Sequence, residues 1–339
     1  MIDLLVVGGG PVGLVTAIHA AGHGLSVVVA EPRETPVDKA CGEGLMPEAL
    51  SHLAGLAVHP RGVPFHGIRY VQGERVAEAR FSTGPGRGVR RTELQRVLSE
   101  QAQAVGVDIV EQRATEVEQG ADWVQACGIR ARYLVGADGL HSTVRRAVGL
   151  HKPSRVPARY GLRQHFGVAP WSDLVEVYWT RKVEIYVTPV ASDTVGIAVL
   201  GAAPLDLARS LADVPGLAER LQGAEPASAL RGAGPLRQVT SGRVSGRTLL
   251  VGDAAGYVDA LTGEGLRVGF QEAAAAVECL RAGRPDDYEA EWRQITRSYR
   301  MLTRTLLWCA GRPQLRRTIV PSAQVLPGVF GALVNSLAA

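Results

Sequence analysis

The stretch "DLLVVGGGPVGLVTAIHAAGHG", residues 3–24, decides the fold of this chain. Its first five residues form an apolar, β-branched run, which predicts a buried parallel strand. Gly8, Gly10 and Gly13 then give the spacing GxGxxG. Gly8 permits a tight turn, Gly10 lets a pyrophosphate approach the backbone, and Gly13 lets a helix pack closely on the strand. The positive end of that helix would face the phosphates.

A second apolar run, "LSVVVA" at residues 25–30, ends in Glu31. The carboxylate of Glu31 is placed to accept hydrogen bonds from both ribose hydroxyls. Strand, glycine-rich turn, helix, strand and terminal acid therefore predict a dinucleotide-binding unit, and the alternative is a glycine-rich turn without a ligand. A ribose-binding glutamate fits NAD or FAD and argues against the 2′-phosphate of NADP at this position.

Two later segments favour FAD over NAD. They are "RYLVGADGLHSTVRRAVGL" (residues 132–150) and "RTLLVGDAAGYVDALTGEGLRVGFQEAAAA" (residues 247–276). In the second, a strand ends at Asp253, and a helix begins after Gly265. Asp253 can accept hydrogen bonds from ribityl or ribose hydroxyls, and the helix start can stabilise negative charge on a reduced flavin. A simple NAD dehydrogenase has no need of this second unit, whereas an extended FAD does.

The motifs "GGGPVG", "GADGLHSTVRR" and "GDAAGYVDALTGEG" resemble the flavoprotein superfamily of para-hydroxybenzoate hydroxylase. The resemblance is strongest to its geranylgeranyl-reductase-like branch, which carries a Cys-Gly-x-Gly segment where this chain has "CGEGL" at residues 41–45. It spans residues 1 to about 285. It implies an α/β (α+β overall) fold with a Rossmann-like FAD-binding domain, an inserted antiparallel substrate sheet and a helical C-terminal region. It also implies FAD as cofactor and NAD(P)H as a transient reductant.

The resemblance places cofactor contacts at the glycine-rich turn, at the end of the second strand and in the later segments. The implied residues are Gly8, Gly10, Pro11, Val12, Gly13, Glu31, Arg33, Cys41, Gly42, Arg91, Ala114, Asp138, Gly252, Asp253, Gly263 and Gly265. Arg91 would stand at the start of a helix beside the diphosphate, and the backbone of Ala114 would contact the adenine. Gly256 and Ala260 stand where the hydroxylase branch has histidine and proline, and both differences favour the reductase-like branch.

The pattern between the motifs predicts an interrupted cofactor domain. "FHGIRYVQGERVAEARF" alternates across a turn at Gly73, and residues 158–200 hold four short alternating runs. We therefore expect an FAD-binding domain of residues 1–64, 87–155 and 235–285, a substrate-binding sheet domain of residues 65–86 and 156–234, and a C-terminal helical cap of residues 286–339.

Cys41 has no histidine close in sequence and no CxxxxC partner. The pattern therefore favours a small residue that shapes the cofactor site over a nucleophile or a redox partner.

Candidate catalytic residues lie in "EIYVTP", residues 184–189. In the superfamily such a strand end, closed here by Pro189, sits over the active site. Tyr186 is expected to bind or protonate substrate and Glu184 to act as a base; the alternative is an ordinary half-exposed strand. Flavin halogenases carry tryptophans at these two positions, which argues against halogenation.

Arg163 and His165 are two residues apart and share one face of "RYGLRQHFGV". Either is a candidate to bind a phenolate or carboxylate of the substrate. A surface role is the alternative.

Composition excludes several classes of protein. The net charge is only +4, the arginines are scattered and no aromatic-basic module appears, so we expect no nucleic-acid partner. The four cysteines are far apart, which argues against zinc and disulfides and favours a reducing cytoplasm. The opening "MIDLLVVGGG" resembles no signal peptide, and no apolar run is long enough to span a bilayer.

The apolar C-terminal segment, residues 312–339, begins with "RPQLRR". It is compatible with peripheral membrane contact or with a cap over an apolar substrate tunnel, and ordinary packing against the rest of the protein is the alternative. The sequence leaves the oligomeric state open.

Two reactions fit these features. The first is monooxygenation (hydroxylation or epoxidation) through a flavin C4a-hydroperoxide, with O₂ and a hydrophobic aromatic or polyketide-like secondary metabolite as co-substrates. The second is reduction of carbon–carbon double bonds in an isoprenoid or another unsaturated lipid. A binding protein that holds FAD structurally is a third alternative, and it would show no NAD(P)H-dependent flavin reduction.

Overall fold

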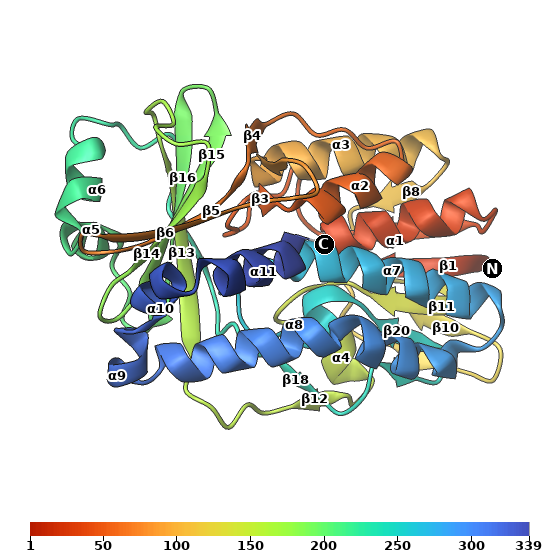
Figure 1. Cartoon of the computed structure of the whole chain (residues 1–339). Helices are drawn as coiled ribbons and strands as arrows, with labels where there is room; N and C mark the ends of the chain where they lie inside the picture. Colours follow the sequence, from red (N-terminus) through yellow and green to blue (C-terminus); the bar gives the residue numbers. More distant parts are fainter. Residues whose placement is uncertain (339) are drawn as a thin grey trace.

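A computed structural model describes residues 1–338. Two sheets stand at opposite ends of the molecule, and the long helix α8 (Tyr288–Ala310) extends along both (Figure 1). The chain passes from the first sheet to the second more than once, so segments distant in sequence meet between them.

The first sheet has eight strands, with the path β19–β20–β11–β1–β2–β8 and with β10 and β9 beside β11. Neighbours from β20 to β8 along this path are parallel. Both faces of this sheet are covered, which explains the uninterrupted apolar runs of its central strands. The strands are β1 (Ile2–Val7), β2 (Val27–Ala30), β8 (Asp108–Val110), β9 (Glu118–Gln119), β10 (Val124–Ala126), β11 (Ile129–Gly136), β19 (Val244–Ser245) and β20 (Thr248–Leu250).

The helix α1 (Pro11–Gly22) packs between α3 (Arg91–Ala104) and α7 (Gly265–Arg281). The contact with α7 is close, because a Cβ added to Gly269 would lie 2.5 Å from a methyl carbon of Val12. The same part of the molecule holds α2 (Pro47–Gly55), α4 (Thr143–Ala147) and the 3₁₀ turns η1 (Gly252–Ala255) and η2 (Pro285–Asp287).

The second sheet has seven strands in the order β17–β13–β16–β15–β14–β5–β6. All neighbours are antiparallel except β5 and β14, which pair in parallel. The strands are β5 (Gly67–Gln72), β6 (Arg75–Arg80), β13 (Arg159–Phe166), β14 (Val175–Trp179), β15 (Glu184–Ala191), β16 (Thr194–Ala202) and β17 (Arg231–Ala233). The hairpin predicted around Gly73 and the four predicted runs are therefore strands of one sheet.

Shorter elements join the two parts. They are the three-stranded sheet β3 (Gly44–Leu45), β7 (Gly86–Gly88) and β4 (Val63–Phe65), and the pair β12 (His151–Lys152) and β18 (Val239–Thr240). The helices α5 (Leu207–Ala212) and α6 (Pro215–Arg220) instead pack on the outer side of the seven-stranded sheet (Figure 1).

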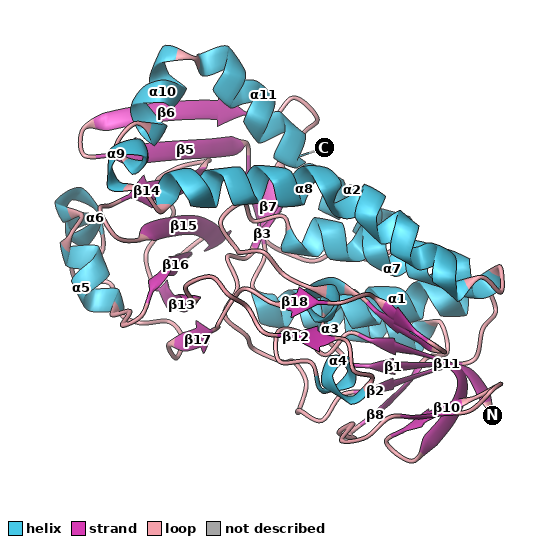
Figure 2. Cartoon of the chain, turned by 90° about the horizontal axis from the view of Figure 1, so that it is seen from below, coloured by secondary structure: helices cyan, strands magenta, loops and turns pink. Residues whose placement is uncertain are grey.

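The C-terminal helices α9 (Pro313–Arg316), α10 (Ile319–Val325) and α11 (Pro327–Ala338) follow α8. Figure 2 shows α10 and α11 beside β5 and β6, and Phe330 and Val334 are buried there against Tyr70 and its neighbours. Within residues 1–338 no single helix is long and apolar enough to cross a membrane, although α10 and α11, bent by 110° at their junction, pass that test as a pair. The predicted mixed α/β fold with a helical C-terminal region is confirmed.

Candidate functional site

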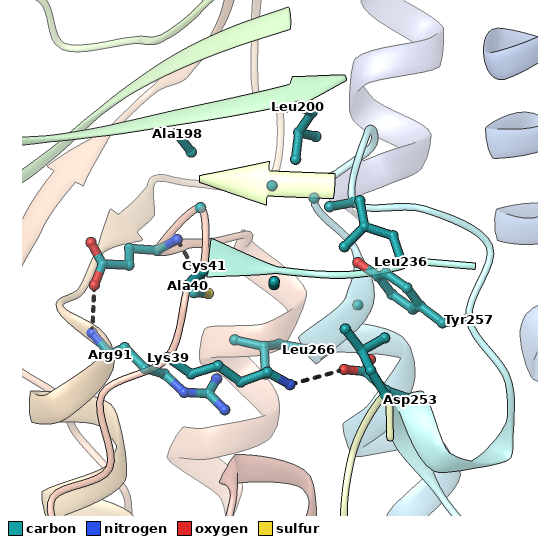
Figure 3. Close-up of a pocket in the computed structure, with 18 of the residues that line it drawn as sticks. Lys39, Ala40, Cys41, Arg91, Ala198, Leu200, Leu236, Asp253, Tyr257 and Leu266 are labelled. Atoms are coloured by element: carbon teal, nitrogen blue, oxygen red, sulfur yellow. Dashed lines mark hydrogen bonds and ion pairs between the residues drawn. The ribbon is translucent and has the colours of Figure 1, made fainter. Parts of the chain in front are cut away.

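A cavity of about 740 Å³ lies between the two sheets. One part runs from the N-terminus of α1 to that of α7, and the other lies against the seven-stranded sheet. Figure 3 shows Lys39 and Asp253 in the first part, with Ala198 and Leu200 of β16 on the opposite side.

The glycine-rich turn forms a cradle at one end of the cavity. Gly8 has φ +111°, and a Cβ added to Gly13 would lie 1.9 Å from the carbonyl oxygen of Gly8, so both positions require glycine. Gly10 precedes α1, and no side chain among residues 1–338 caps the free N–H groups of that helix. Gly10, Pro11 and Val12 line the cavity. This exposed helix start suits a pyrophosphate.

Glu31 follows β2 and is 2% exposed. Its carboxylate accepts a hydrogen bond from the Gly9 N–H at 2.9 Å and is held by the Arg33 guanidinium at 2.7 and 2.9 Å. Burial between these donors fixes the acid at the end of the strand, where the sequence predicted a ribose contact. Arg33 itself lines the cavity.

The far part of the cofactor cleft is built by segments that are distant in sequence. Lys39 Nζ lies 3.4 Å from an Asp253 carboxylate oxygen, and both residues line the cavity (Figure 3). The carboxylate of Asp138 accepts N–H bonds from Thr143 and Val144 at the start of α4, while its other oxygen is buried without a partner among residues 1–338. The cleft thus supplies unsatisfied acceptors for hydroxyl groups.

The remaining predicted cofactor residues divide into two groups. Those that line the cavity are Arg33, Cys41, Gly42, Arg91, Asp138, Gly252, Asp253, Gly263 and Gly265. Ala114 is buried after β8 and is not part of the lining. Its contact with an adenine therefore stays a prediction.

The interpretation of Glu184 as a base that faces the substrate is wrong. Glu184 is fully buried, and its two carboxylate oxygens are ion-paired with Arg159 at 2.6 Å and Arg316 at 2.5 Å. Arg316 belongs to α9 and also donates to the backbone carbonyls of Thr180 and Val183. Glu184 therefore anchors the C-terminal helices to the seven-stranded sheet instead of lining the cavity.

We predict that Arg316→Ala loosens this anchor. An uncompensated buried charge costs about 3–5 kcal/mol in the free energy of unfolding, and because Arg159 still pairs with Glu184, that range is the upper bound for this variant. The expected result is a large fall in the thermal midpoint and faster proteolysis within α9–α11. The control is Arg317→Ala, because the neighbouring Arg317 is exposed and forms no ion pair among residues 1–338. Equal stability of the two variants would contradict the anchoring role.

The structure also contradicts the predictions for Arg163 and His165 as substrate contacts, because both side chains are buried outside the cavity lining and are paired with other residues. Pro189 does not line the cavity either, and its contact with substrate stays a prediction. His165 is buried, and its Nε2 donates to the Glu43 carboxylate at 2.5 Å. Arg163 is buried too, and its guanidinium binds the Asp38 carboxylate. These two side chains of β13 hold the loop that contains "CGEGL" against the sheet, and so they position the cofactor cleft indirectly.

Glu43 is the centre of that loop. It has φ +60°, its carboxylate accepts the Arg91 N–H at 2.8 Å, and its own N–H donates to the Cys41 sulfur at 3.4 Å. Sequence reasoning missed Glu43, although its place between two glycines was a signal for a strained turn. Cys41 lines the cavity, and the other three cysteines are not among the lining residues.

Tyr186 does line the cavity, as predicted, but its hydroxyl donates to the Leu261 carbonyl at 2.7 Å. Burial, with a contribution from Glu184, raises the pKa of Tyr186 well above its usual value. Tyr186 is therefore a neutral wall residue in this structure, and its catalytic role stays a prediction. Tyr70 and Tyr257, which the sequence analysis did not single out, also line the cavity.

A glycine cradle, a buried acid at the end of β2 and a second strand–turn–helix unit carrying Asp253 fit an extended FAD, with a separate chamber beside it. The fold and the site thus define a FAD-binding flavoprotein. A family model described as "FAD binding domain" matches residues 1–199, so the chain belongs to this family, within the para-hydroxybenzoate hydroxylase-like superfamily.

Known proteins are similar over most of the chain. It is 28% identical to dialkyldecalin synthase of Streptomyces rugosporus over 80% of its length, and it spans 63% of that protein. It is 28% identical to menaquinone reductase of Mycolicibacterium smegmatis (88% of this chain, 80% of the relative) and 27% identical to rifampicin monooxygenase of Rhodococcus hoagii (100% and 78%). A flavoprotein/dehydrogenase structure from Cytophaga hutchinsonii superimposes with a TM-score of 0.80 at 21% identity, covering 98% of this chain and 96% of that one.

Proposed function

We propose that this chain is a FAD-dependent, NAD(P)H-using monooxygenase that acts on a hydrophobic aromatic or polyketide-like molecule. When bound, reduced FAD supplies the activation of O₂. The chain's residues hold the cofactor, orient the substrate and exclude water. The similarity to rifampicin monooxygenase supports this reaction class.

The charge pattern of the cavity is the observation that carries the proposal. All the lysines, arginines and carboxylates of its lining belong to the cofactor cleft: Arg33, Lys39, Glu43, Arg91, Asp138 and Asp253. The wall contributed by the seven-stranded sheet, as far as the described residues go, has no such group and presents side chains such as Ile68, Val177 and Leu200. An apolar chamber of this kind excludes water from the reacting atoms.

Two hydroxyls are available in the chamber to orient a substrate. Tyr70 and Tyr160 line it, and neither hydroxyl has a hydrogen-bond partner within residues 1–338. Burial raises the pKa of Tyr70 above its usual value, so its hydroxyl remains a neutral donor. These residues fit a substrate that is largely apolar and carries one or two oxygen atoms.

A bulky side chain placed in the chamber tests whether the chamber binds the substrate. Ala198 lies on the cavity side of β16 (Figure 3), so Ala198→Trp should weaken binding of a phenolic probe such as naphthol at least tenfold, with FAD content unchanged. Binding is measured from the perturbation of the flavin absorbance. Ala202→Trp, at an exposed position of the same strand, is the matched control. Equal naphthol affinity in the two variants would place the substrate elsewhere.

Reduction of a carbon–carbon double bond is the second candidate. Cys41 favours it, because its side chain lies in the cavity wall within "CGEGL" (Figure 3) and because menaquinone reductase is among the relatives. Long isoprenoid chains would also suit the apolar chamber.

We predict that Cys41→Ser retains most of the activity and all of the FAD. Serine keeps the small size, and within residues 1–338 the backbone N–H of Glu43 is the one group that forms a hydrogen bond with the Cys41 sulfur. The measurement is turnover with NAD(P)H at equal flavin concentration. Complete loss of turnover with FAD still bound would instead give the sulfur a chemical role and favour the reductase.

Peripheral membrane contact and a cytoplasmic location are further parts of this proposal. Val325, Leu326 and Val329 are exposed at the junction of α10 and α11. Leu337 of α11 lines the cavity, so the same two helices connect the chamber with an exposed apolar corner. Such an arrangement suits a substrate that partitions into lipid.

A further inference from the structure

A second, smaller cavity lies behind the wall that holds Asp253. Its volume is about 70 Å³, and it shares Asp253 and Tyr257 with the large cavity. Four arginines line it: Arg237 and Arg243 on either side of β18, and Arg300 and Arg304 from α8. Figure 1 shows these two elements in the same part of the molecule.

Among residues 1–338, no carboxylate is ion-paired with three of these guanidinium groups. Within residues 1–338, none of Arg237, Arg300 and Arg304 takes part in a hydrogen bond or an ion pair through its side chain. Arg243 lines the same cavity and is different, because its guanidinium donates to the Glu289 carboxylate at 2.8 Å. Arg300 lies over the Trp292 ring at 4.6 Å, which holds it in place without neutralising it.

The positive charges of these arginines repel one another. Burial and the charges of Arg304, Arg243 and Arg237 lower the pKa of Arg300 to about 10. Burial and Arg304 also lower the pKa of Arg237. An anion bound between guanidinium groups offsets such repulsion and accepts hydrogen bonds from them.

The nearby acids do not supply that anion. Glu272 lines the cavity, but burial raises its pKa to about 8, and its carboxyl oxygen accepts the Gly252 N–H. Asp259 is ion-paired with Arg159, and Asp253 faces Lys39. Each acid therefore has another role or is largely protonated near neutral pH.

We propose that Arg237, Arg300 and Arg304 bind a phosphate-type oxyanion in this cavity. The cavity is about a tenth of the volume of the cofactor cavity, and it suits a compact tetrahedral oxyanion. Arginine forks match phosphate oxygens in geometry and charge. The phosphate belongs either to free inorganic phosphate or to the nicotinamide coenzyme, whose remainder would lie outside the cavity.

Calorimetric titration of the FAD-loaded protein with inorganic phosphate and with pyrophosphate tests the site. We expect binding of at least one of them, weakened at least tenfold by Arg300→Gln and by Arg304→Gln. The control is Arg297→Gln, because Arg297 is an exposed arginine of α8 outside the cavity lining. Thermal midpoint and flavin content establish that each variant is folded. Absence of binding to the parent protein, or equal affinity in all variants, would overturn the proposal.

Steady-state kinetics distinguish free inorganic phosphate from a phosphate group of the nicotinamide coenzyme. If the ligand is the 2′-phosphate of the coenzyme, Arg304→Gln raises the KM for NADPH at least tenfold and leaves the KM for NADH unchanged. If it is the diphosphate of the coenzyme, both KM values rise at least tenfold. If free phosphate is the ligand, both KM values stay unchanged while phosphate binding is lost. The calorimetric result does not depend on the monooxygenase reaction, so the failure of one proposal is distinguishable from that of the other.

Discussion

Asp253→Ala is expected to yield a folded protein that is largely free of FAD. Asp253 follows β20 at the start of the cofactor cleft's far wall, and Lys39 is its only ion-pair partner within residues 1–338. A carboxylate in this place accepts the hydroxyls of the flavin chain. Loss of a hydrogen bond to a charged group costs about 1.5–3 kcal/mol, which is roughly a 10- to 100-fold rise in Kd for FAD.

The measurement is the ratio of flavin absorbance to protein absorbance after gel filtration, followed by titration of the apoprotein with FAD. Asp122→Ala, at an exposed acid in the turn between β9 and β10, is the control and should keep its full flavin content. A stoichiometric amount of FAD in Asp253→Ala, with a parent-like Kd, would contradict the placement of the cofactor.

Gly13→Ala has the largest expected effect on the cofactor domain itself. The added methyl carbon would lie 1.9 Å from the Gly8 carbonyl oxygen and 3.1 Å from the Ala137 side chain. Because the closest atom is backbone, α1 has to move away from β1, and the cradle opens. Overpacking of this kind costs about 1–3 kcal/mol or more and removes the aligned N–H groups that face the pyrophosphate.

A matched control exists on the same helix. Gly22 ends α1, and a Cβ added there meets no atom within 4 Å. Gly22→Ala should therefore be neutral or stabilising by about 0.5–1 kcal/mol, because alanine loses less backbone entropy than glycine. Chemical unfolding with FAD content as a second readout distinguishes the two variants. If Gly13→Ala and Gly22→Ala behave alike, the close packing of α1 on β1 is wrong.

The cofactor half of the fold was predictable because its signals are local. Gly8 and Gly13 are required by a turn and a helix contact within a few residues of each other, and Glu31 follows directly from the end of an apolar strand. Asp253 also stands inside a local strand–turn–helix pattern. Such local patterns predict the same structure whatever residues stand elsewhere in the chain.

The substrate half was less predictable, because partners distant in sequence decide which face of a strand is the cavity wall. Glu184 has the same strand parity as Tyr186, yet Arg316 of α9 draws it into a buried ion pair. Likewise, His165 contacts Glu43, a residue far away in sequence, instead of the cavity. The parallel pairing of β5 with β14, which brings Tyr70 into the cavity, likewise has no signal in either strand alone.

Rapid mixing of the anaerobically reduced FAD-loaded protein with oxygenated buffer tests the proposed monooxygenase reaction most directly. The flavin spectrum is followed with and without naphthol. The apolar chamber predicts a transient absorbance that is distinct from both the reduced and the oxidised flavin, and that lasts longer when the chamber is occupied. Direct return to the oxidised spectrum under both conditions would contradict the monooxygenase and favour the double-bond reductase.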